Sequence, residues 1–254
     1  MNMENIELIE ITKDNISMYP PRCFLNPTNA GQMKKTQWLK EQMKHGMKVK
    51  LLYKQQKLIG YIEYVPGEFA WRAVNANNYL FIHCIWITPK KIHGKGYGSF
   101  LINECIKDAE KQNMLGVAVV TSKGPFMADH TLFLKNDFTK IDEKEPFSLL
   151  VKKVKQGKNP TIRNFEKQLA KFKGLHIVYA DQCPWVSRFI VEMQKRFEEL
   201  NISITQLKTA KDAQNAPSLY ATFNLIYNGK IYVDHYISQR RFENIIKKEI
   251  KLET

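Results

Sequence analysis

Apolar and polar residues follow two different spacings in the first part of the chain. Residues 49–65 alternate roughly between bulky and polar side chains around a polar turn at 54–57, which predicts two strands. Residues 31–47 instead carry apolar side chains at helical spacing, with Gly46 near the expected end of the helix. A dense aromatic and β-branched run at residues 78–89 predicts a buried strand that ends at Pro89.

The next segments continue this alternation of elements. An apolar helical stripe follows the glycines at 94–98 and extends to about Asn113. Residues 115–122 are apolar throughout, as in a strand covered on both faces of a sheet. A short helix at 129–138 and a strand at 147–154 complete the pattern. Together with an opening strand and helix, this order predicts an α/β fold with a mixed sheet.

The character of the sequence changes near Val154. Polar residues with Gly157 and Pro160 predict a linker that leads into a basic helix. A second α/β pattern follows, with a strand, a helix, a strand, a hairpin and a closing helix. Asn228 and Gly229 mark the hairpin turn. We therefore expect one domain at 1–156, a linker and helix at 157–173, and a smaller domain at 174–254.

Composition narrows the class of protein. Hydrophobic residues make up 44% and charged residues 25% of the 254 residues, which is ordinary for a globular protein. No stretch approaches the roughly 18 apolar residues that a membrane span needs. The first residues are acidic, unlike the basic start of a signal peptide. We expect a cytoplasmic protein with no membrane partner.

The four cysteines lack the spacing of a metal or disulfide framework. Cys23, Cys84, Cys105 and Cys183 form no CxxC pair and no cluster with histidine. This pattern fits a reducing compartment and predicts no metal.

The formal net charge of +14 is the unusual bulk property. Such a charge favours an anionic partner, which could be a nucleic acid or an anionic cofactor. The lysines are spread along the whole length without an arginine-rich block, so we weigh ordinary surface lysine above nucleic-acid binding. No feature of the sequence predicts an oligomeric state.

Glycines cluster where a strand gives way to a helix. Gly94, Gly96 and Gly98 do not have the spacing of a P-loop, and they fall one position short of a dinucleotide fingerprint. They do fit a turn whose amides form a helix N-terminus that binds a pyrophosphate. Surrounding positive charge comes from Lys90, Lys91 and Lys95.

This segment, with the apolar strand and the "TLFLKNDF" that follow, resembles the acetyl-CoA site of the Gcn5-related N-acetyltransferase (GNAT) superfamily. The resemblance covers roughly residues 5–154. The family signature is Arg or Gln, two residues, Gly, one residue, then Gly or Ala, and the matching positions are His93, Gly96 and Gly98. The resemblance implies acetyl-CoA as cosubstrate and an amine of a small molecule or peptide as acceptor.

The resemblance also assigns the cofactor contacts. It implies that backbone amides from the glycine turn hold the pyrophosphate, and that the preceding strand aligns the pantetheine where two central strands separate. The implied residues are Ile85, Trp86, Ile87, His93, Gly94, Lys95, Gly96, Tyr97, Gly98 and Ser99. Two positions depart from the family: His93 replaces the usual Arg or Gln, and Phe133 stands where many members carry a tyrosine that protonates the thiolate.

Proton transfer therefore has to come from other side chains. His83 lies on the strand before the turn, where some family members carry a glutamate base, and simple alternation puts it on the face of Ile85 and Ile87. Glu63 and Glu68 lie on or beside the neighbouring strand, and Glu68 follows a Pro-Gly turn. We take His83 and Glu68 as the candidate bases.

Candidate acceptor contacts lie in irregular segments. The Pro-rich loop "YPPRCFLNPTN" contains Arg22 and Cys23, in the region where this family builds its acceptor pocket. Arg72 could bind an acidic substrate group or pair with Glu68. These three residues are the candidate substrate contacts.

The second domain places Cys183 between a strand and a helix, where the positive end of the helix favours a thiolate. The element order resembles the thioredoxin fold, in which Pro217 would be the cis-proline that faces this cysteine. From about Gly174 onward the chain also resembles the YoaP-like domain found behind GNAT domains. A dithiol site would need a cysteine at Val186, so a disulfide oxidoreductase is disfavoured.

An acetyl-CoA-dependent N-acetyltransferase is the function that these features favour. Two alternatives stay open. In one, Cys183 does thiol chemistry and the front domain only senses CoA. In the other, the acetyltransferase acts on a target linked to nucleic acid.

Overall fold

The computed structural model describes residues 5–21, 23–124 and 127–252. The chain divides into two compact units. The first unit comprises Met1–Pro21, Lys40–Ala70 and Val74–Ile162, and the second comprises Arg22–Leu39, Trp71–Ala73 and Arg163–Thr254. Two short segments from the first third of the chain thus belong to the second unit.

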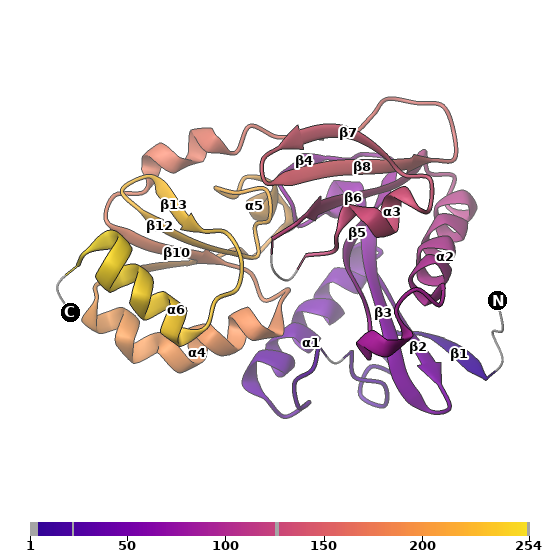
Figure 1. Ribbon diagram of the computed structural model, residues 1–254, viewed down its shortest axis with the longest axis horizontal. Helices are drawn as coiled ribbons and strands as arrows, with labels where there is room; N and C mark the ends of the chain where they lie inside the picture. The colour runs from indigo at the N-terminus through magenta and orange to yellow at the C-terminus, as the bar shows by residue number, and fades with distance from the viewer. Residues whose placement is uncertain (1–4, 22, 125–126, 253–254) are drawn as a thin grey trace. The chain divides into compact units, whose positions relative to one another are not determined.

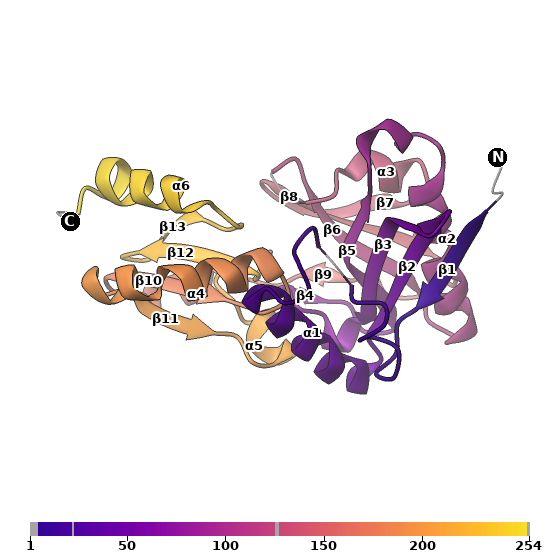
Figure 2. The same ribbon diagram turned by 90° about the horizontal axis from the view of Figure 1, so that it is seen from below.

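A mixed seven-stranded sheet forms the first unit (Figure 1). Its strand order is β1-β2-β3-β5-β6-β8-β7, and β5 and β6 are its parallel pair. The strands are β1 (Ile6–Glu10), β2 (Lys48–Lys54), β3 (Lys57–Pro66), β5 (Tyr79–Ile87), β6 (Gly116–Ser122), β7 (Thr139–Lys144) and β8 (Phe147–Lys153). Figure 2 shows β1, β2 and β3 side by side at one edge of this sheet. The predicted α/β class with a mixed sheet is confirmed.

Helices and short pieces connect these strands. They are α1 (Ala30–Gln42), α2 (Tyr97–Lys111), α3 (His130–Leu134), the 3₁₀ turns η1 (Met43–His45), η2 (Gly67–Phe69) and η3 (Lys90–Ile92), and a two-stranded sheet of β4 (Val74–Asn75) and β9 (Thr161–Ile162). Gly46 ends the predicted helical run in a left-handed conformation, with φ +82°. No helix in the described ranges is long and apolar enough to cross a membrane.

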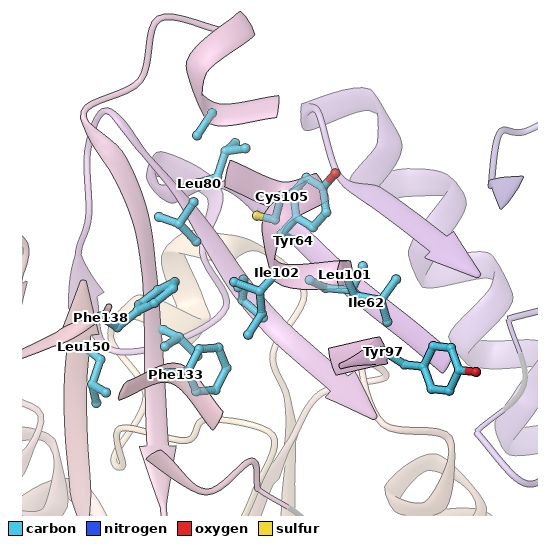
Figure 3. Close-up of a cluster of buried hydrophobic side chains, with 14 of the residues drawn as sticks. Ile62, Tyr64, Leu80, Tyr97, Leu101, Ile102, Cys105, Phe133, Phe138 and Leu150 are labelled. Carbon is cyan, nitrogen blue, oxygen red and sulfur yellow. The ribbon is translucent and has the colours of Figure 1, made fainter. Parts of the chain in front are cut away.

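The apolar stripe of α2 packs on one face of the sheet, as Figure 3 shows. Leu101, Ile102 and Cys105 are fully buried there, against Ile62 of β3 and Leu150 of β8. Burial raises the pKa of the Cys105 thiol well above its usual value. Cys105 is therefore a small apolar core residue.

A buried polar network also joins α2 to the sheet. The Asp108 carboxylate of α2 is 4% exposed and lies 3.1 Å from Lys48 Nζ and 3.0 Å from Lys50 Nζ. The Tyr64 hydroxyl of β3 donates a hydrogen bond to the same carboxylate. Each buried charge therefore has partners, as burial requires.

The second unit contains a four-stranded sheet in the order β11-β10-β12-β13. Its elements are the 3₁₀ turn η4 (Glu166–Lys171), β10 (Leu175–Tyr179), α4 (Pro184–Glu199), β11 (Ser203–Gln206), α5 (Ala210–Gln214), β12 (Phe223–Tyr227), β13 (Lys230–Val233) and α6 (Gln239–Asn244), which continues as a π-helical turn at Ile245–Ile250. β10 runs parallel to β11 and antiparallel to β12. Apolar side chains of α4 and α6 share one core with β10 and β12.

Two sequence predictions concern this unit: the hairpin turn at Asn228 and Gly229, and a cis peptide bond before Pro217. Asn228 and Gly229 both have positive φ, +47° and +78°, as the predicted hairpin turn requires. Pro217 is not preceded by a cis bond, so that expectation is wrong. The cis peptide bonds among the described residues are Thr88–Pro89 and Glu145–Pro146.

Candidate active site

The two central strands of the first unit separate halfway along β5. The parallel register between β5 and β6 runs from Tyr79, opposite Gly116, to Ile82, opposite Val119. Beyond that point β5 stays paired with β3 as far as Ile87, and β6 stays paired with β8 as far as Ser122. The strands therefore diverge at His83, and we refer to residues His83–Ile87 as the diverging edge of β5.

A β-bulge lies at the same point. Tyr64 of β3 pairs with Ile82 and Glu63 pairs with Cys84, so His83 is the extra residue on β5. A bulge places two residues opposite one and turns the affected side chain. Ile85 and Ile87 pack against the α2 core, whereas His83 lies against Glu63, whose neighbours Ile62 and Tyr64 face that core. Simple alternation, which put His83 on the face of Ile85 and Ile87, is wrong here for this reason.

A buried carboxylate–imidazole pair results. Nδ1 of His83 lies 3.5 Å from Oε1 of Glu63, and both side chains are 0% exposed. The Tyr61 hydroxyl donates a hydrogen bond to the other oxygen of Glu63. The Tyr61 and Trp86 rings stack in parallel, with centroids 5.6 Å apart. The His83 ring and the Tyr61 hydroxyl thus contact the two carboxylate oxygens of Glu63 at the point where the strands diverge.

The glycine turn leads from β5 into α2. Gly94 and Gly96 adopt left-handed φ values of +77° and +82°, which favour glycine. Gly96 is the N-cap of α2 and offers no side-chain cap to the first-turn amides. A Cβ at Gly94 would meet no atom within 4 Å, so this side of the turn is open.

Gly98 has a different role from the other two glycines. A Cβ at this position would lie 3.1 Å from Cδ1 of Leu132, so its small size lets α2 pack closely against α3. The first α2 residue, Tyr97, has a buried ring whose hydroxyl accepts a hydrogen bond of 2.8 Å from Lys54 Nζ. Because this ring is buried and its hydroxyl is bonded, Tyr97 can contact a ligand at the turn only through its backbone amide.

His93 and the lysines complete the turn. Nε2 of His93 lies 2.8 Å from the carbonyl oxygen of Ile87 and so links the turn to the end of β5. Lys90, Lys91 and Lys95 are exposed around it, and Ser99 is half-buried on the first turn of α2. The turn combines open backbone amides with nearby positive charge, a combination suited to an anionic group.

Phe133 of α3 is a core residue. It is 0% exposed, and its ring meets that of Phe138 edge-on with centroids 5.3 Å apart. Its side chain has no proton to donate, and its surroundings are apolar.

The other predicted site residues have partners of their own. Oε1 of Glu68 accepts a 2.8 Å hydrogen bond from the amide of Asn78, so this exposed carboxylate fixes a loop. Arg72 and Cys23 belong to the second unit, and Arg22 lies outside the described residues. The Arg72 guanidinium is buried, donates to Oε1 of Gln182 at 2.6 Å, and stacks over the Tyr220 ring.

Cys183, the candidate thiol, is the N-cap of α4 in the second unit. Its side chain is half-buried, and Pro184 occupies the first helical position. The nearby Asp181 carboxylate accepts 2.6 Å hydrogen bonds from the Ser187 hydroxyl and from the Gln206 amide. The described residues contain no group of three or more His, Cys, Asp or Glu side chains that could hold a metal.

Glu63 is the residue that sequence reasoning underrated. A glutamate in the middle of an apolar strand, flanked by Ile62 and Tyr64, is a signal for a buried carboxylate. Its pairing with His83 depends on strand register and on the bulge, which no local pattern reveals.

Two stretches of the chain match known protein families. Residues 13–126 match the model of the acetyltransferase (GNAT) family, and residues 201–244 match the YoaP-like family. The uncharacterized N-acetyltransferase YoaP of Bacillus subtilis (strain 168) is 29% identical over 247 residues, spanning 94% of this chain and 97% of that protein.

Solved structures resemble part of the chain. N-acetyltransferase PseH of Campylobacter jejuni in complex with acetyl coenzyme A is 20% identical over 59% of this chain and 99% of that one, with a TM-score of 0.39. The putative acetyltransferase yncA of Salmonella typhimurium with its cofactor acetyl-CoA is 13% identical over 61% and 97% of the two chains, with a TM-score of 0.44.

Proposed function

We propose that this chain transfers acetyl from acetyl-CoA to an amine, with Glu63 and His83 as the proton-accepting pair. The match of residues 13–126 to the GNAT family and the 29% identity to an N-acetyltransferase over 94% of the chain support this proposal. The observation that carries this proposal is the position of the pair. Glu63 and His83 lie at the point where β5 and β6 diverge. His83 is on β5, the strand that leads into the glycine turn.

The residues of the first unit fit acetyl-CoA. Amides at the start of α2, with Gly94 and Gly96 keeping the turn free of side chains, would hold the diphosphate. The diverging edge of β5 would hold the pantetheine by backbone hydrogen bonds, since its residues have left the ladder with β6. Acetyl-CoA supplies the activated thioester that the amine attacks.

The acceptor amine has to lose a proton before or as it attacks. Glu63 can accept this proton through His83 or through water, because its carboxylate lies 3.5 Å from Nδ1 of that ring. The Tyr61 hydroxyl bond to Glu63 fixes the carboxylate in place during the transfer. An amide of the diverging edge would stabilise the oxyanion that develops on the thioester carbonyl. Phe133 takes no part in proton transfer.

We take the acceptor to be an amine on a small molecule or a peptide. The stacked Tyr61 and Trp86 rings lie beside the buried carboxylate, and such rings provide apolar contact area to an organic amine. Arg22, Cys23 and Arg72 remain weaker candidates for contact with the acceptor. Arg72 is already bonded to Gln182 and stacked on Tyr220.

We propose that the C-terminal domain has a thioredoxin-like fold. Its strand order β11-β10-β12-β13, with a parallel β10–β11 pair joined through α4, supports this interpretation. We therefore propose that this domain binds a thiol or peptide group, independently of acetyl transfer.

Two measurements test the proposed function. Isothermal titration with acetyl-CoA measures binding, and a panel of polyamines, amino sugars and peptides with free N-termini is then screened for release of free CoA. Saturable acetyl-CoA binding with CoA release that depends on one amine class supports the proposal. Absence of acetyl-CoA binding by the folded chain would overturn it.

A further inference from the structure

Cys183 stands at the positive end of a long helix in the second unit. It is the N-cap of the 16-residue α4, and its thiol is half-buried rather than enclosed in the core. The first-turn amides of such a helix favour a negatively charged sulfur. The next position at which a thioredoxin-type site would carry a cysteine is Val186, which is fully buried in the core of the unit. A second thiol therefore cannot come from α4 itself.

The segment that contains Cys23 is fixed at this same end of α4. The indole Nε1 of Trp185 donates a 2.9 Å hydrogen bond to the carbonyl oxygen of Cys23. Trp185 lies two residues after Cys183, in the first turn of α4. Cys23 is also half-buried.

A second contact holds the segment independently. A Cβ at Gly31 would lie 2.1 Å from the carbonyl oxygen of Pro184 and 2.8 Å from the amide of Arg188. Only glycine allows the first turn of α1 to come this close to the first turn of α4. The two contacts belong to one compact unit, and both join the segment at residues 23–31 to the first turn of α4.

The remaining cysteines differ in their surroundings. Cys105 is 0% exposed in the core of the first unit, and Cys84 lies on β5 of that unit. Neither shares a unit with Cys183, whereas Cys23 does. The second unit thus contains two half-buried cysteines. Cys183 is the N-cap of α4, and the backbone carbonyl of Cys23 is hydrogen-bonded to Trp185 in the first turn of that helix.

We propose that Cys23 and Cys183 form a dithiol–disulfide pair, a redox site in which Cys23 takes the place of the second cysteine that α4 lacks. The oxidant is a low-molecular-weight disulfide. The Cys183 thiolate attacks one of its sulfurs, which forms a mixed disulfide and releases one thiolate. The Cys23 thiolate then attacks Sγ of Cys183, which forms the Cys23–Cys183 bond and releases the second thiolate. The protein loses two electrons and two protons, and the small disulfide is reduced to two thiols.

The test uses the full chain with oxidised glutathione as the probe. Reduced protein is incubated with an excess of this disulfide, quenched with N-ethylmaleimide and digested with trypsin. Cys23 and Cys183 then lie on separate peptides, residues 23–34 and 174–188, and mass spectrometry finds whether these are linked. We expect the linked pair in the wild type and equally in Cys84→Ser, the matched control.

Two variants separate the steps. Cys23→Ser should stop at a glutathione adduct on Cys183, and Cys183→Ser should give no linked peptides and react at Cys23 roughly tenfold more slowly than the wild type at Cys183. Separate adducts on both cysteines of the wild type, with no linked pair, would overturn the proposal. So would linkage found only between different chains, which a mixture of isotopically light and heavy protein reveals. None of these measurements depends on acetyl transfer.

Discussion

Oε1 of Glu63 lies 3.5 Å from Nδ1 of His83 across two adjacent strands, and neither side chain is exposed. A β-bulge creates this relationship, because it makes His83 the extra residue opposite Glu63. The bulge coincides with the point where β5 and β6 diverge, so the buried pair and the opening between the strands share one structural cause.

Replacing Glu63 with glutamine tests its role as proton acceptor. Glu63→Gln keeps the shape of the side chain and an oxygen for the Tyr61 hydroxyl, so we expect the melting temperature to change little. We expect kcat for amine acetylation to fall by about 10²–10³-fold, the usual contribution of a general base. The Kd of acetyl-CoA should be unchanged. Glu68→Gln is the matched control, because its carboxylate is exposed and accepts a hydrogen bond from the amide of Asn78 in a loop. Equal losses in both variants would contradict the assignment.

Gly94→Ala tests the glycine turn, with Gly174→Ala as its control. Both glycines have similar positive φ, +77° and +75°, and a Cβ at either would meet no atom within 4 Å. The strain of a left-handed alanine, about 1–2 kcal/mol, should therefore lower stability similarly in both. Only Gly94→Ala should weaken acetyl-CoA binding, by roughly tenfold or about 1.4 kcal/mol, measured by titration calorimetry. The same affinity in both variants would mean that the turn does not hold the cosubstrate.

Asp108 should make the first unit sensitive to acid. Burial alone would raise the pKa of the Asp108 carboxyl, yet hydrogen bonds from Tyr64, Lys50 and Lys48 outweigh it and lower that pKa below its usual value. A depressed pKa in the folded state gives stability that is present above the unfolded pKa of about 3.9 and is lost as the pH falls through the folded pKa. Urea unfolding between neutral and strongly acidic pH measures this loss.

The variant Asp108→Asn checks the source of that acid sensitivity. It removes the closer of two carboxylates that pair with the buried Lys50, the other being Glu104, so we expect a loss of about 3 kcal/mol in the free energy of unfolding at neutral pH. The acid-dependent component should shrink as well. Asp137→Asn is the control, since its carboxylate also pairs with a lysine but is 84% exposed. Comparable losses in the two variants would contradict the importance of burial.

Phe133→Leu distinguishes a core role from a catalytic one. The ring is fully buried against Phe138, so its shortening should cost about 1 kcal/mol of stability. Because Phe133 has no proton to donate, kcat should stay within about twofold of the wild type under conditions where the variant is folded. A kcat that falls by an order of magnitude would place Phe133 in contact with the reacting groups.

The sequence predicted the elements whose stability depends on burial. β2, β3, β5, β6 and α2 all carry regular apolar spacing, and all were expected. β7 was missed because its side chains are largely exposed and charged, and its stability comes from pairing with β8. α5 was missed because five residues hold too little periodicity for a helical pattern.

The candidate site was predictable only where its geometry is local. The glycine turn was found because φ preference and helix capping involve neighbouring residues. The Glu63–His83 pair joins residues 20 positions apart through a strand register that a single bulge changes. The position of Cys23 beside α4 depends on a hydrogen bond to Trp185, 162 residues along the chain. Such relationships are set by tertiary packing, which local patterns do not encode.

The second unit is assembled from three separate stretches of the chain. Residues 22–39 and 71–73 lie within the stretch that matches the GNAT family model, yet they belong to the second unit. A fragment that begins at Arg163 would lack both Arg72, which is buried against Tyr220, and the Cys23 segment. Such a fragment would therefore not contain the second unit complete, although it would contain every strand of its four-stranded sheet.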